Sequence, residues 1–129
     1  MPWLDEEIPE LLRDGITDRL RQRLKAAPEL SIFEVRDHGM LLGLYGQARN
    51  AVQYEIGNPL IASSMTRYAL GAGLYAPLRV LLYEGDSGGS CIEYDLPSSL
   101  FGQFGDDRVT EVGHALDVAL GRALSAAAG

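Results

Sequence analysis

Apolar residues recur every three or four positions along the last part of the chain, and this pattern constrains the fold more than any other. Such spacing puts side chains on one face of an α-helix. Acidic Asp106 and Asp107 stand at its start and Arg122 near its end, as the helix dipole favours. The pattern therefore predicts a long final helix, with an apolar face formed by Val109, Val112, Leu116, Leu120 and Leu124.

Four shorter segments upstream either alternate apolar and polar residues or are almost wholly apolar, as β-strands do. They cover residues 31–38, 51–57, 77–84 and 90–95. The "GDSGG" stretch between the last two is typical of a turn, so these two strands are expected to form a hairpin. The apolar character of residues 77–84 predicts a central, well-covered strand.

Helical segments are expected between the strands. Residues 39–48 predict a helical turn or loop, and residues 58–73 predict a helix. An amphipathic helix is also expected near the N-terminus, from the four-residue spacing of Ile8, Leu12, Ile16, Leu20 and Leu24. The order of elements predicts a two-layer α+β domain, a mostly antiparallel sheet with helices on one face.

Length and charge narrow the classes of function. A chain of 129 residues forms one domain, here expected to span 1–129. Its net charge of −7, from 18 acidic and 11 basic residues, argues against nucleic-acid and anionic-membrane partners. A single cysteine, Cys91, cannot form an internal disulfide. The acidic N-terminus lacks the pattern of a secretory signal, and no apolar run is long enough for a membrane span, so we expect a cytoplasmic location.

Two short motifs could carry chemistry. In Gly57-Asn58-Pro59 the glycine permits a turn, Asn58 is a helix cap and Pro59 suits the first helical position. The same geometry would turn backbone N–H groups and the Asn58 amide toward a ligand. His38, preceded by Asp37 at the end of the first predicted strand, is a candidate acid–base group or a hydrogen-bonded structural residue.

Arg79 lies in the central predicted strand. A guanidinium near a helix-covered face needs a carboxylate, and Glu93 or Asp95 across the hairpin could supply it. Glu84 differs from residue 79 by an odd number, so the two face opposite sides. Two histidines and one cysteine at unrelated spacings give no zinc signature, so no metal or cofactor is expected.

From residue 31 to about 125, the chain resembles the bacterial family called domain of unknown function 302. The resemblance rests on "VRDHG", "YEIGNP", "APLRVLLYE" and "IEYDLP" in this order. It implies a topology like that of the TATA-binding protein, and a homodimer, but neither nucleic-acid binding nor an agreed activity. "MPWLDEEIPELL" offers no counterpart of the family's first strand. Leu96 also occupies the family's acidic position, with Asp95 one residue earlier and so on the opposite face.

These observations favour a non-catalytic, homodimeric domain that binds a small ligand or a partner between sheet and helices. The candidate ligand-binding residues are His38, Asn58, Arg79, Tyr94 and Asp95. One alternative is an enzyme that uses His38 as general acid or base, oriented by Asp37 or Asp95. Another is an interaction module that pairs a partner strand at a sheet edge left exposed by the missing first strand.

Overall fold

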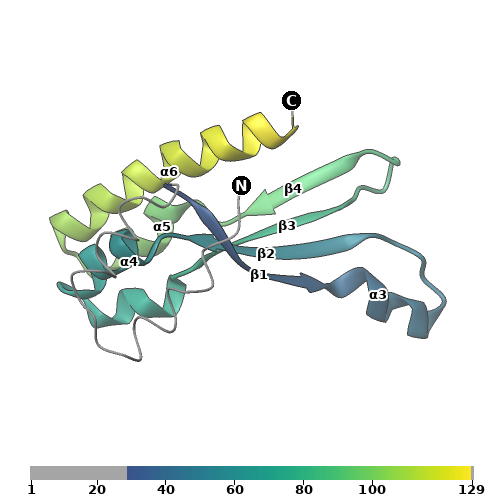
Figure 1. The fold of residues 1–129 in the computed structure, drawn as a ribbon, viewed down its shortest axis with the longest axis horizontal. Coiled ribbons are helices and arrows are strands. Elements are labelled where there is room, and N and C mark those ends of the chain that lie inside the picture. The colour runs from purple at the N-terminus through teal and green to yellow at the C-terminus, as the bar shows by residue number, and fades with distance from the viewer. Residues whose placement is uncertain (1–28, 129) are drawn as a thin grey trace.

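The computed structural model describes residues 29–128, which form an antiparallel sheet with helices along one face (Figure 1). This is the α+β architecture that the sequence predicts. The expected N-terminal helix from Ile8 to Leu24, and the question of a strand before it, lie outside the described residues.

The sheet contains one strand for each of the four predicted segments. These strands are β1 (Ser31–Asp37), β2 (Ala51–Gly57), β3 (Leu78–Glu84) and β4 (Ser90–Tyr94). All neighbouring pairs are antiparallel, and the spatial order β1-β2-β3-β4 follows the chain. The central position predicted for residues 77–84 is therefore confirmed. The expected hairpin is formed by β3 and β4.

Helical segments join the strands and close the fold. They are α3 (His38–Leu42), η1 (Gly43–Tyr45), α4 (Pro59–Thr66), η2 (Leu70–Tyr75), α5 (Pro97–Phe101), η3 (Gly102–Phe104) and α6 (Asp107–Ala128). The long final helix is confirmed as α6. The helix predicted over 58–73 is wrong in length, because α4 ends at Thr66 and η2 follows as a separate 3-10 turn. Ala69 is extended there, and Gly71 and Gly73 disfavour a continuous helix.

The strand register divides the sheet into two faces, because directly paired residues project to the same side. Ile56 pairs with Leu78 and Tyr54 with Val80 on the face that α6 covers. Arg79 pairs with Glu55 on the opposite face. The expectation that the Arg79 guanidinium lies near a helix-covered face is therefore wrong, since its neighbours Leu78 and Val80 take the helix side.

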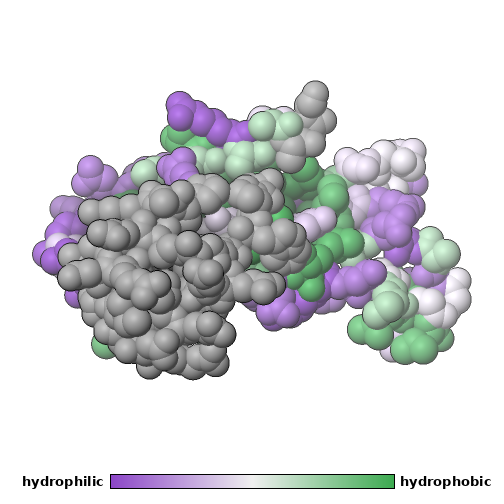
Figure 2. Space-filling view, viewed as in Figure 1, coloured by the Kyte–Doolittle hydropathy of each residue, from purple (hydrophilic) through white to green (hydrophobic). Residues whose placement is uncertain are grey.

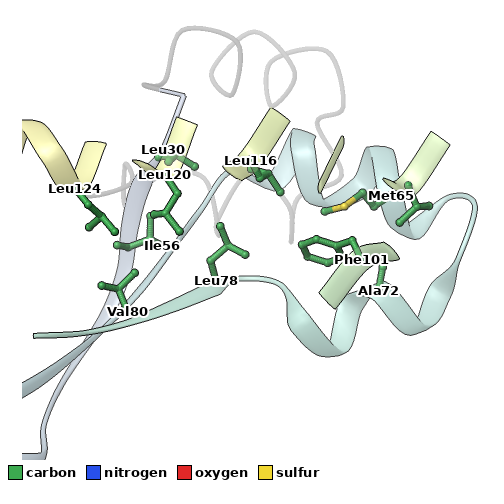
Figure 3. Packing of buried hydrophobic residues seen from close by; sticks show 11 residues of the cluster. Leu30, Ile56, Met65, Ala72, Leu78, Val80, Phe101, Leu116, Leu120 and Leu124 are labelled. Atoms are coloured by element: carbon green, nitrogen blue, oxygen red, sulfur yellow. The ribbon is translucent and has the colours of Figure 1, made fainter. Parts of the chain in front are cut away.

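The core lies between α6 and the sheet and continues into the helices beyond the strand ends (Figure 3). Leu120 and Leu124 of α6 pack over Ile56 and Val80. Around Phe101, which is fully buried, a second part of the core is formed mainly by helices. The predicted apolar stripe of α6 is thus confirmed, with Val112 only half-buried.

Candidate functional site

A pocket opens where the sheet meets the helices, and we call it the sheet–helix pocket. Its volume is about 350 Å³. Strands β1 to β3 and helices α4, α5 and α6 all contribute to its wall. The residues that matter for its chemistry are Phe33, Glu55, Asn58, Ala62, Phe101 and Leu116. Figure 3 shows that Phe101 and Leu116 also belong to the core, so the pocket reaches into the buried interior.

The Gly57-Asn58-Pro59 motif builds one wall of this pocket. Asn58 is extended, and its Oδ1 accepts a hydrogen bond of 2.9 Å from the Leu60 N–H, while Pro59 begins α4. A Cβ atom on Gly57 would lie 3.1 Å from the Phe33 ring, so the glycine lets this ring approach β2 closely. The capping role predicted for Asn58 is confirmed. Among the described residues, its amide nitrogen has no hydrogen-bond partner.

Apolar side chains form nearly all of the pocket surface, and among the described lining residues two are polar. These are Asn58 at the start of α4 and Glu55 on β2. The Glu55 carboxylate accepts a 2.6 Å hydrogen bond from Arg36, which raises the pKa of that guanidinium. The arrangement suits a compact apolar molecule with one polar group, because pockets of this kind bind by burial and orient by a few polar contacts.

A second cavity lies on the sheet face opposite α6, and we call it the opposite-face cavity. Its volume is about 480 Å³. Four of the five predicted ligand-binding residues line it, namely His38, Arg79, Tyr94 and Asp95. Asn58 is separated from them and lines the sheet–helix pocket. Tyr94 pairs with Val80 on the α6 side, so the register directs its side chain away from this cavity.

His38 contacts an amide instead of a carboxylate. Its Nε2 lies 3.0 Å from Oε1 of Gln53, on the neighbouring strand. Asp37 is occupied as the N-cap of α3, where its Oδ1 accepts a 3.0 Å hydrogen bond from the Met40 N–H. Among the described residues, neither Asp37 nor Asp95 hydrogen-bonds to His38. A general base normally needs such an orienting partner, so the enzyme hypothesis lacks its second component here.

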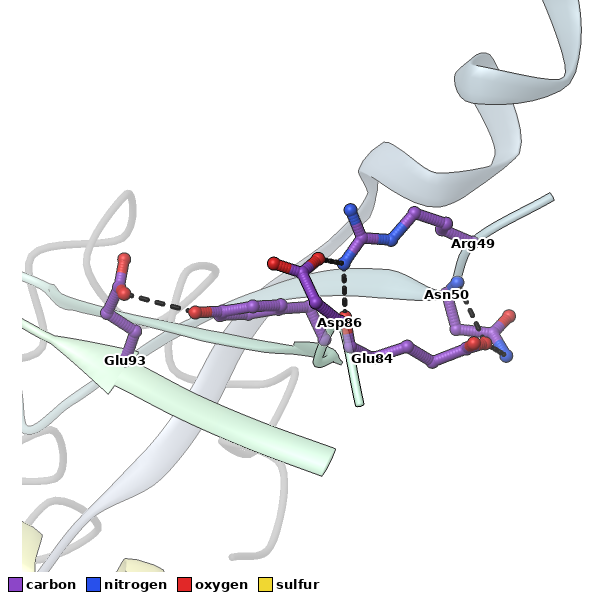
Figure 4. A network of polar contacts seen from close by, with 6 residues as sticks. Arg49, Asn50, Glu84, Asp86 and Glu93 are labelled. Carbon is purple, nitrogen blue, oxygen red and sulfur yellow. Dashed lines mark hydrogen bonds and ion pairs between the residues drawn. The ribbon is translucent and has the colours of Figure 1, made fainter. Parts of the chain in front are cut away.

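The acidic partner expected for Arg79 is also absent from the part of the chain that the structure describes. Glu93 instead accepts a 3.2 Å hydrogen bond from the Tyr83 hydroxyl, which raises the pKa of the phenol (Figure 4). The Arg79 guanidinium is exposed and makes no ion pair with a described residue. It could therefore bind a ligand carboxylate in the opposite-face cavity.

A polar cluster at the far end of the central strands was not foreseen from the sequence (Figure 4). Arg49 donates hydrogen bonds to the Glu84 carbonyl at 2.6 Å and to Asp86 at 3.2 Å. The Asn50 N–H donates to the Glu84 carboxylate at 3.1 Å. These exposed contacts join the start of β2 to the end of β3. The only sequence signal was that Asn50 directly precedes a predicted strand.

Among residues 29–128, no group of three or more histidine, cysteine or acidic side chains could hold a metal ion. Nor does this part of the chain contain a helix with the length and apolar character needed to cross a bilayer.

Comparison with known proteins then fixes the family. The model of Domain of unknown function DUF302 matches residues 12–127. The chain belongs to the DUF302 family. The match extends well before residue 31, where the resemblance recognised in the sequence begins.

Among solved structures, this DUF302 chain is similar to one described as the crystal structure of uncharacterized conserved protein DUF302 from Bacillus stearothermophilus. The two share 18% identity with a TM-score of 0.67, over 92% of this chain and 87% of the other. Likeness at this identity shows a shared fold and nothing about activity. The comparison with curated proteins gives no match.

Proposed function

We propose that this DUF302 protein is a non-catalytic, homodimeric binding module whose small ligand occupies the sheet–helix pocket. The observation that carries the proposal is an apolar pocket of about 350 Å³ that reaches the core residues Phe101 and Leu116. The pocket is open on one side, so its apolar wall faces water when it is empty, which costs free energy in proportion to the apolar area. Retention of this much apolar space is more easily explained by an occupant than by packing alone.

The size and polarity of the pocket define the ligand class. An apolar cavity of roughly 150 Å³ takes up benzene, so about twice that volume has room for a two-ring molecule. Among the described residues of the lining, Glu55 is the one that is charged, and its carboxylate, on the sheet face opposite α6, is paired with Arg36 at 2.6 Å, so the pocket interior offers no free charge to bind an ion. The Asn58 amide at the start of α4 can donate a hydrogen bond to a ligand in the pocket. The proposed ligand is therefore uncharged and mostly apolar, with a single hydroxyl or comparable group.

A second candidate is a polar ligand in the opposite-face cavity. It is favoured by one observation, namely that His38, Arg79 and Asp95 line the same cavity. Arg79 would bind a carboxylate, and His38 would supply a hydrogen bond beside it. The enzyme hypothesis belongs to this site, with His38 as acid or base, but it has no orienting carboxylate among the described residues.

The ligand hypothesis can be tested with 2-naphthol, a two-ring phenol. Native mass spectrometry of untagged protein first reports any retained molecule. Calorimetric titration of ligand-free protein with 2-naphthol then compares wild type with Ala62→Leu, which adds three carbon atoms to the pocket wall. We expect saturable binding by wild type and at least tenfold weaker binding by the variant. Cavity filling commonly adds about 0.5–2 kcal/mol of stability, so the variant should melt no lower.

The matched control is Ala115→Leu, an equal enlargement on the exposed side of α6 and outside the pocket. It should bind 2-naphthol as wild type does. Absence of saturable binding by wild type, or equal affinity in Ala62→Leu, would overturn the proposed site. A retained molecule that is lost in Arg79→Gln but kept in Ala62→Leu would transfer the function to the opposite-face cavity.

A further inference from the structure

The segment between β1 and β2 exposes an unusual concentration of large apolar side chains. We call α3 with η1, residues 38–45, the apolar tip. Four of its side chains are Met40, Leu41, Leu44 and Tyr45, at 72%, 57%, 80% and 77% exposure. Residues 38–48 contain no aspartate, glutamate, lysine or arginine. The tip stands at the end of the sheet, far from α6 and the core (Figure 1).

The tip is a built element with defined ends. Asp37 caps its first turn, and Gly46, with φ of 71°, ends its last. Gly39 packs directly against the backbone entering β2, where a Cβ atom would overlap the Arg49 carbonyl oxygen and lie 2.7 Å from the Ala51 nitrogen. The backbone therefore directs these apolar side chains outward, and packing among the described residues leaves them exposed.

The same chain carries an apolar hollow on the α6 side of the sheet. We call it the apolar groove; its volume is about 220 Å³, and its lining is Ile32, Tyr54, Ile56, Val80, Leu82, Ile92 and Leu124. Leu82 and Ile92 remain 37% and 38% exposed. In Figure 2, hydrophobic residues gather between the C-terminal part of α6 and the β3–β4 hairpin, and again at the tip.

We propose that the apolar tip of one copy docks in the apolar groove of a second copy, and that its own groove receives the partner's tip. This inference rests on the homodimer in the proposed function and assigns its interface. The tip projects from the chain and the groove is recessed in it. In a two-fold dimer, each tip can therefore be buried in the groove of the other copy. Each copy carries a net charge of −7, and an uncharged tip is where two such copies approach at least electrostatic cost.

The available area matches a stable dimer. The four tip side chains, Leu82 and Ile92, and the flanking Val35 and Tyr94 are 36–80% exposed. At roughly 150–250 Å² for a whole aromatic side chain and less for an aliphatic one, they present at most on the order of 800 Å², about what each partner contributes to a standard interface. Val35 and Tyr94 extend the groove because both lie in the row of paired residues that runs through Tyr54 and Val80.

Because each copy contributes both a tip and a groove, the interface can be tested by placing opposite charges on these two surfaces. Leu44→Lys alters only the tip, and Ile92→Glu alters only the groove. Each homodimer contains its substitution twice. If each substitution costs about 2 kcal/mol, as loss of a hot-spot residue does, the dimer dissociation constant should rise about 1,000-fold. Mixing the two variants should restore a dimer. In that heterodimer one contact is wild type and the other pairs lysine with glutamate. Sedimentation equilibrium measures the association, and native mass spectrometry identifies the heterodimer by mass.

The control is Leu74→Lys, since Leu74 is 78% exposed in η2 and lies outside both surfaces. It should dimerise as wild type does. Circular dichroism checks folding, and Leu82→Glu replaces the groove variant if Ile92→Glu does not fold. A dimer that survives the tip and groove variants, or a mixture that stays monomeric, would overturn this interface. A monomeric wild type would overturn the homodimer as well, whereas 2-naphthol binding tests the ligand proposal separately.

Discussion

Two glycines of α6 offer an internally controlled test of how the helix layer is packed. Gly113 faces α5, where a Cβ atom would lie 3.1 Å from Ser98 Cα and 3.3 Å from Phe101 Cβ. Gly121, two turns later in the same helix, has no atom within 4 Å of such a Cβ. Alanine at either position gains the same backbone preference for helix. The two substitutions differ mainly in what the new methyl group meets.

The magnitudes decide the sign at each position. Glycine within a helix costs roughly 0.5–1 kcal/mol relative to alanine, so Gly121→Ala should raise the free energy of unfolding by that amount. Gly113→Ala gains the same but overpacks the contact, which typically costs about 1–3 kcal/mol. Relief would require moving α5, and Phe101 is fully buried and cannot shift freely. We therefore expect Gly113→Ala to be about 1–3 kcal/mol less stable than Gly121→Ala, and up to about 2.5 kcal/mol less stable than wild type.

Urea unfolding followed by circular dichroism measures both variants under one condition. The expected order of stability is Gly121→Ala, wild type, Gly113→Ala. A Gly113→Ala protein as stable as Gly121→Ala would refute the close contact between α5 and α6. Because Phe101 also lines the sheet–helix pocket, the same variant should bind 2-naphthol differently from wild type, whereas Gly121→Ala should not.

Two further predictions concern helix starts. Arg108 donates hydrogen bonds to both oxygens of Asp106, and these lower the pKa of the carboxyl to about 2. A depressed pKa stabilises the fold above about pH 4, the ordinary range of this group, and this contribution is lost as pH falls toward 2. In urea unfolding, the free energy of unfolding should thus fall more steeply between about pH 4 and pH 2 for wild type than for Asp106→Asn. An equal fall in the two proteins would contradict this prediction. For the α4 cap, Asn58→Ala should cost about 1 kcal/mol and Asn58→Asp much less. Equal melting temperatures for the two variants would exclude a stabilising cap.

Much of the fold could be predicted because it depends on local patterns. Alternation along residues 51–57 predicts that Val52, Tyr54 and Ile56 share a face, and the register confirms it. Spacing along α6 predicts its buried side. The prediction that Arg79 lies near a helix-covered face was wrong for a different reason. Alternation says which residues share a face, but whether the helices cover that face depends on tertiary packing.

The candidate sites depend still more on tertiary structure. Residues from six elements line the sheet–helix pocket. One of these elements, α5, is only five residues long, so its sequence shows no periodic pattern. No local pattern could reveal that Phe101 and Leu116 meet near Gly57. The motif at residues 57–59 did indicate a corner of the pocket, since a strand that ends in a capped helix start must leave the sheet there.

The two proposed binding surfaces lie along the same strands and meet where Ile56 of the groove precedes Gly57 of the pocket. Gly57 and Leu78 belong to the pocket at one end of β2 and β3, while Leu82 in the groove lies toward the other. Helices α4, α5 and α6 cover the first end, which produces a partly open apolar pocket suited to a small molecule. The distal part of the sheet extends past most of this cover, and it leaves an apolar surface suited to a second copy. Uneven coverage of one continuous sheet thus accounts for both surfaces. Each can be altered by substitutions that leave the other unchanged.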